Sequence, residues 1–115
     1  MSPIAFDCKL PVFHTLAVAL SDLDPLFGHL VGELGPPLAR EVRDHAIQAL
    51  FAIAGAAAST GAVQRTHFRR ARRHVAQVVA GLELLVPLRA AYPDAVAPFV
   101  QRFQAIRGQL ARLAG

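Results

Sequence analysis

The sequence predicts an all-α protein, an antiparallel up-down-up-down four-helix bundle that forms a single domain over residues 1–115. Apolar residues recur at intervals of three and four positions through four segments, which is the spacing of one helix face. Prolines and glycines separate these segments, and none of them alternates apolar and polar residues as a half-buried strand does. Much of the 54% hydrophobic content is alanine, which is typical of closely packed helices. Four such helices with short connections pack most simply as a bundle.

The first half of the chain contains two predicted helices. The first covers residues 11–34, and Pro25 should kink it or restart it after Asp24, because proline has no N–H to donate. Its apolar row is Phe13, Leu16, Leu20, Leu23, Phe27, Leu30 and Leu34. The second helix covers residues 37–58, after the break Gly-Pro-Pro, with Pro37 in its first turn. Its apolar row is Leu38, Val42, Ala46, Ala49, Leu50, Ile53 and Ala57.

The second half contains two more predicted helices. One covers residues 62–88 after a Ser-Thr-Gly break, and its apolar row is Phe68, Ala71, Val75, Val78, Val79, Leu82 and Val86. The other covers residues 94–113, and Pro98 is tolerable there only within the first turn. Its apolar row is Val96, Phe99, Val100, Phe103, Ile106, Leu110 and Leu113. We expect these rows to form one core that includes Leu50, Ile53, Phe68, Val75, Phe103 and Ile106.

The positive charge of the chain is concentrated in residues 64–75, which read QRTHFRRARRHV. The net charge is +4, yet without the five arginines of this stretch seven bases would face eight acids. At about 100° per residue, the apolar row of this helix lies opposite most of the arginines. The resulting polar face contains Arg65, Arg69, Arg72 and Arg73, with Arg70 and His74 on one flank.

These arginines predict an anion-binding surface rather than an ordinary solvated face. No acidic residue occurs between Asp44 and Glu83, so the five arginines have no partner within their own helix. Five like charges within nine residues repel one another, and solvent screens that repulsion only in part. Guanidinium groups make bidentate contacts with phosphate and carboxylate. The pattern leaves open whether the anion is a nucleic acid or an acidic protein surface.

Other chemistries are not expected. The five histidines, at positions 14, 29, 45, 67 and 74, lack the i, i+3 or i, i+4 pairing of helical metal sites, so we expect no metal. The sequence contains no nucleophile elbow and no phosphate-binding loop. We therefore expect a non-enzymatic protein without catalytic residues or cofactors.

The sequence also bears on location. Residues 1–11 contain an acid and two prolines where the apolar part of a signal peptide would begin, so none is expected. Residues 45–64 lack acids, lysine and arginine over the length of a membrane span, but polar residues and glycines dilute them. The lone Cys8 excludes an internal disulfide and fits a reducing compartment. These features predict a cytoplasmic protein without a membrane segment.

The order of helices and three segments resemble the accessory variability determinant proteins of diversity-generating retroelements. The segments are HFRRARRHVAQVVAGLELL in the third helix, the loop with Tyr92, and FQAIRGQL in the last helix. The resemblance covers about residues 10–113 and includes a wider four-helix group with proteins encoded in intervening sequences of ribosomal RNA. The chain departs from the family in having one lysine and in ending on ARLAG, without the family's closing aromatic and lysine.

The resemblance implies a homopentamer that binds the reverse transcriptase of the element and its RNA or RNA–DNA hybrid. Such a protein supports mutagenic copying without being a catalyst itself. The matching basic positions are the five arginines of the third helix, together with Arg102 and Arg107 in the last helix.

Two other functions stay open, a ribosomal-RNA-associated four-helix protein and a helical adaptor that binds only proteins. Independently of the resemblance, apolar residues at the margins of the rows predict a homo-oligomer. These residues are Leu26, Val31, Val63, Leu84 and Ala111.

Overall fold

The computed structural model of the chain describes residues 8–115, so most of the segment in which no signal peptide is expected lies outside it. The described residues form helices connected by turns and contain no strand. The helices are α1 (Pro11–Asp22), α2 (Asp24–Phe27), α3 (Gly35–Ala57), α4 (Gly61–Leu84) and α5 (Pro93–Ala114). The predicted all-α class is confirmed.

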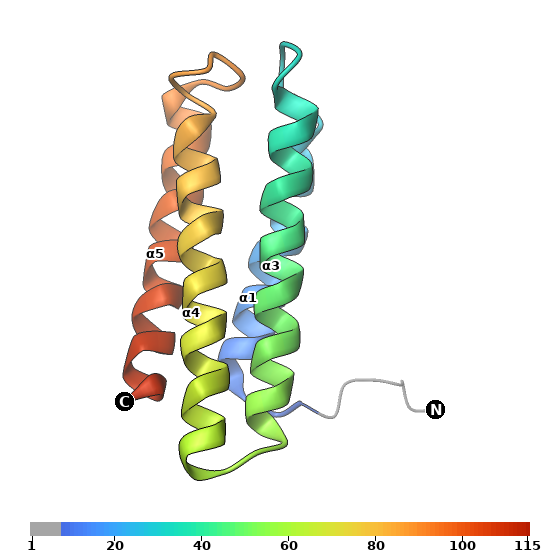
Figure 1. The fold of residues 1–115 in the computed structure, drawn as a ribbon. Helices are drawn as coiled ribbons and strands as arrows, with labels where there is room; N and C mark the ends of the chain where they lie inside the picture. The colour runs from blue at the N-terminus through green and yellow to red at the C-terminus, as the bar shows by residue number, and fades with distance from the viewer. Residues whose placement is uncertain (1–7) are drawn as a thin grey trace.

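The four long helices form an antiparallel bundle in the predicted up-down-up-down order (Figure 1). Helix α1 contacts α3 and α5, and α4 contacts the same two helices, so each long helix has two principal neighbours. The single turn α2 follows α1 and reaches α3. Helix α4 therefore lies diagonally across the bundle from α1, an arrangement that matters for the charges described below.

The first helix is shorter than the predicted 11–34. It ends at Asp22, α2 adds one turn, and residues 28–34 connect to α3. Pro25 has no N–H to continue the hydrogen bonds of α1, and Gly32, in the connection after α2, adopts a φ of 83° that is not helical. As a result Leu34, predicted to face the core, is 52% exposed.

The helix predicted at 62–88 ends at Leu84, because Pro87 lacks an N–H and Arg89 is left-handed with a φ of 61°. The N–H groups of Arg89 and Ala90 donate to the carbonyls of Val86 and Leu85 and close the turn. Pro98 lies in the second turn of α5, not the first, where it leaves the carbonyl of Asp94 without its usual helical donor. The helices predicted at 37–58 and 94–113 differ from α3 and α5 by at most two residues at each end.

The apolar rows meet in one core. Five of the six residues predicted to be buried together are buried, and the exception is Leu50, which is half-buried at the edge of α3. Leu113 and Ala57, the last residues of their predicted rows, are exposed, whereas the adjacent Ala114 and Ala56 are buried. Small residues let α3 and α4 approach closely: a Cβ added to Gly81 would lie 2.6 Å from Cγ2 of Val42.

Residues 45–64 fall in two helices separated by a turn at residues 58–60. Within residues 8–115, no helix combines the length and the apolar character that crossing a membrane requires.

Candidate anion-binding groove

A groove between α4 and α5 gathers four arginines. It has a volume of about 560 Å³, and we call it the arginine groove. One wall comes from α4 and the other from α5, and the small side chains leave room between the guanidinium groups. The lining residues are Arg69, Arg72, Arg73 and Ala76 on α4, and Gln104, Arg107, Gly108 and Ala111 on α5.

Helical spacing explains why these side chains meet. Arg69 and Ala76 each lie three or four residues from Arg72 or Arg73 on α4, so the four share one side of the helix, beside the row that contains the fully buried Ala71 and Val75. On α5, residues 104, 107, 108 and 111 follow the same spacing. Burial of the two apolar rows therefore turns both polar edges toward one seam.

The groove arginines have no acidic partner among residues 8–115. Arg69, Arg72, Arg73 and Arg107 are all exposed, and none of them forms an ion pair there. The only acidic residues of the two helices are Glu83, near the end of α4, and Asp94, in the first turn of α5. Both lie at the opposite end of the helices from Arg69, so the groove carries an unbalanced positive charge.

The structure distributes the other predicted site residues around this groove. Arg65 lies one turn before Arg69, and its Cδ approaches the C-terminal Gly115 at the end of α5. Arg70 is exposed beside His74, on the flank of α4 that faces α3. Arg102 is on the other side of α5, where it donates to Asp22 of α1 at 2.9 Å. Arg107 thus joins the groove and Arg102 does not.

His74 takes part in a contact between helices. Its Nδ1 lies 3.0 Å from Nδ1 of His45 on α3, and the ring centroids are 5.3 Å apart. One of these nitrogens must donate and the other accept, so the contact requires at least one neutral ring. Oε2 of Glu41 lies 3.8 Å from Nε2 of His45, on the far side of that ring.

The surroundings of His74 lower its pKa. Burial is the largest cause, followed by the charges of His45, Arg73 and Arg70. At neutral pH this ring is therefore uncharged and adds no positive charge to the face. An anion bound near Arg70 and Arg73 would offset their effect and favour protonation of His74.

His67 plays a packing role that the sequence pattern did not reveal. Its ring lies against Gly55 of α3, where an added Cβ would come within 3.0 Å of it. Nδ1 of His67 is buried without a hydrogen-bond partner in the described chain. No group of three potential metal ligands occurs among residues 8–115.

Sequence reasoning did not identify Gln104, Gly108 and Ala111 as parts of the site. Their spacing with Arg107 is the signal that could have found them, together with the lack of acids in α5 after Asp94. What the sequence could not show is that this edge of α5 faces α4 while Arg102 faces α1.

Searches of protein-family models, of curated proteins and of solved structures found no match to this chain.

Proposed function

We propose that this chain is a non-catalytic nucleic-acid-binding protein whose arginine groove holds the phosphate backbone. The observation that carries the proposal is the convergence of four exposed arginines, without an acidic partner in the described chain, on one groove between two helices. Phosphate oxygens match the donor fork of arginine, and closely spaced phosphates would relieve the repulsion among the four charges.

The lining supports backbone binding without recognition of bases. Among residues 8–115, no aromatic side chain on which a base could stack lines the arginine groove, and Gln104 is the only uncharged polar side chain there. Contacts with phosphate fix position and contribute affinity but carry no sequence information. We expect affinities that depend strongly on salt and weakly on nucleotide sequence.

The specific form of the proposal is an accessory subunit of a retroelement reverse transcriptase, located in the cytoplasm and assembled as a homo-oligomer. Its support is the resemblance of the basic third helix and of FQAIRGQL in the last helix. Of the apolar residues predicted to mark an interface, Val31, Val63 and Leu84 are exposed, whereas Leu26 is buried in the protomer and Ala111 lines the groove. A reverse transcriptase gene beside this one, with a template repeat, would support the role, and a position inside a ribosomal RNA gene would favour the alternative.

The test compares two double variants with equal loss of charge. Arg72→Ala with Arg107→Ala removes one arginine from each wall of the groove, and Arg40→Ala with Arg89→Ala removes two exposed arginines elsewhere. Affinities for a fluorescent RNA and a DNA of the same sequence would be measured from about 50 to 300 mM salt. A plot of the logarithm of the binding constant against the logarithm of salt concentration should have a slope of about −2 to −4 for each wild-type protomer. The slope should be shallower by about 1.5 in the groove variant.

The control variant should keep most of the affinity and slope. Equal losses in both variants would overturn the groove as the binding site and leave only a response to net charge. A groove variant that binds RNA and DNA normally but no longer captures a neighbouring reverse transcriptase would assign the arginines to an acidic protein surface.

A further inference from the structure

Two connections close the end of the bundle opposite the α3–α4 turn (Figure 1). They are residues 28–34, between α2 and α3, and residues 85–92, between α4 and α5. The N–H of Val31 donates to the carbonyl of Ala90 at 3.0 Å and joins them. Beside this bond lies a cleft of about 680 Å³, within the range of about 300–1,000 Å³ typical of small-molecule sites.

The walls of this end cleft are mostly apolar and include large side chains left in contact with solvent. Tyr92 is 83% exposed and Val31 is 61% exposed. Covering them would remove apolar surface from water, which is the main driving force of apolar binding. The apolar lining residues are Leu26, Val31, Val86, Ala90, Ala91, Tyr92, Pro93 and Ala95.

Arg89 supplies the positive charge of the end cleft, and its backbone is strained. Its φ of 61° is left-handed, a conformation in the turn after α4 that glycine adopts more readily because a Cβ is disfavoured there. The turn holds this conformation through the bonds from Arg89 N–H to Val86 and from Ala90 N–H to Leu85. Among residues 8–115, Arg89 has no ion-pair partner.

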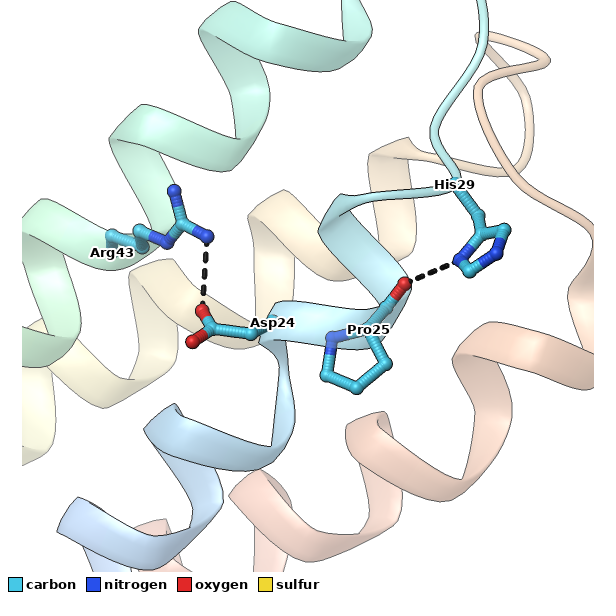
Figure 2. A network of polar contacts seen from close by, with 4 residues as sticks. All are labelled: Asp24, Pro25, His29 and Arg43. Atoms are coloured by element: carbon cyan, nitrogen blue, oxygen red, sulfur yellow. Dashed lines mark hydrogen bonds and ion pairs between the residues drawn. The ribbon is translucent and has the colours of Figure 1, made fainter.

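His29 also lines the end cleft, and its ring is held in place. Nδ1 of His29 lies 2.7 Å from the carbonyl of Pro25, as Figure 2 shows. A carbonyl only accepts, so Nδ1 carries the proton and the ring is fixed to the turn α2. The end cleft thus combines apolar walls with one unpaired guanidinium at its edge.

We propose that the end cleft binds an amphipathic monocarboxylate, with its apolar part against Tyr92 and Val31 and its carboxylate on Arg89. The planar fork of one guanidinium matches a carboxylate in a bidentate contact and balances its single charge. A nucleic-acid backbone fits poorly, because successive phosphates would meet apolar walls and only one arginine. The end cleft therefore differs in ligand class from the arginine groove and does not depend on the function proposed for it.

Isothermal titration calorimetry with decanoate tests the proposal. The uncharged probe is 1-decanol, which has the same chain length. Both probes are used below the concentrations at which they aggregate. Wild type should bind decanoate saturably, one molecule per protomer. Arg89→Gln should weaken decanoate about 3- to 10-fold, the effect of an exposed charge-assisted contact, and should leave 1-decanol unchanged. Arg40→Gln, which removes an exposed arginine on α3, is the matched control and should bind decanoate as wild type does.

Two further variants separate binding from folding. Ala95→Trp places a large side chain in the end cleft and should abolish binding of both probes. Arg89→Gly removes the charge and the strain together, so it should weaken decanoate as Arg89→Gln does while its melting temperature stays the same or rises. Saturable decanoate binding that survives Ala95→Trp, equal affinity in Arg89→Gln and wild type, or absence of saturable binding would each overturn the proposal.

Discussion

Arginines on the two sides of the bundle differ in whether they have acidic partners. Where α1 and α2 meet their neighbours, two arginines are paired: Arg43 of α3 binds Asp24 at 3.0 Å, and Arg102 of α5 binds Asp22 at 2.9 Å. Figure 2 shows the first of these pairs. Each guanidinium also lies near an aromatic ring, 5.0 Å from the centroid of Phe27 for Arg43 and 5.9 Å from that of Phe99 for Arg102. Where α4 meets α5, four arginines share one groove, and no acid of the described part of the chain lines it.

The topology of the bundle explains the difference. Helices α1 and α2 carry two aspartates and no lysine or arginine, so arginines on neighbouring α3 and α5 can reach them. Helix α4 lies diagonally opposite, so its arginines cannot reach these aspartates. Arg43 and Arg102 are therefore neutralised on one side of the molecule, whereas the four arginines of the groove are left available on the other. An exposed arginine indicates a binding site only after its neighbours in space are known.

The largest effect should come from the core beneath both sides. Phe103 is fully buried, and Phe103→Ala should lower the free energy of unfolding by about 3–5 kcal/mol, because it removes apolar contacts and leaves a cavity. Urea unfolding followed by circular dichroism would measure it. Arg107→Ala, one turn away on α5, should change stability by no more than about 0.5 kcal/mol. A loss under about 1 kcal/mol for Phe103→Ala would contradict the placement of this face of α5.

Breaking a pair on the α1 side should have a smaller effect. Asp24→Asn should cost about 0.2–1 kcal/mol of stability, because both partners are substantially exposed and the ion pair is screened by solvent. A double-mutant cycle with Arg43→Ala isolates the pair. A coupling energy near zero, unaffected by salt, would mean that Arg43 and Asp24 are not partners in solution.

The His45–His74 contact should add a small dependence on pH. The folded-state pKa of His74 is lowered from 6.5, so folding favours the neutral ring. The neutral His74 ring makes its full contribution to folding stability above about pH 6.5. This contribution is lost as the pH falls toward the lower, folded-state pKa. Melting temperatures from pH 7.5 to 5.5 should decline more steeply in wild type than in His74→Gln. An identical dependence of melting temperature on pH in the two proteins would mean that His74 does not contribute to it.

The fold was predictable because it depends on local patterns. The three- and four-residue spacing identified α3, α4 and α5 to within about four residues, and Phe68, Val75 and Phe103 are buried as the spacing required. The errors lie at helix ends. Whether a helix continues past Pro25 or Pro87 depends on contacts between residues distant in sequence, such as the hydrogen bond from Val31 to Ala90.

The candidate site was less predictable, because it depends on which helices become neighbours. The sequence indicated a basic face on α4, and Arg69, Arg72 and Arg73 do line one groove. It treated Arg102 and Arg107 alike, although they lie on opposite sides of α5. The pairing of Arg102 with Asp22 joins residues 80 positions apart, a separation at which helical periodicity gives no information.

The most direct test of the phosphate-binding claim introduces an acidic side chain into the arginine groove, as a partner like those that Asp22 and Asp24 provide on the α1 side. Gln104→Glu changes one amide to a carboxylate of nearly the same shape among Arg69, Arg72 and Arg107. Gln109→Glu makes the same change on α5 outside the groove and serves as the control. RNA affinity as a function of salt, with urea stability, would be measured for both variants.

If the groove is kept free of acids in order to bind phosphate, Gln104→Glu should keep or slightly raise the stability, by up to about 1 kcal/mol, because the new carboxylate has arginine partners. The same variant should bind RNA more weakly than Gln109→Glu does, with a shallower salt slope, because its carboxylate competes with phosphate. Equal RNA affinity and equal salt slopes in the two variants would contradict the account.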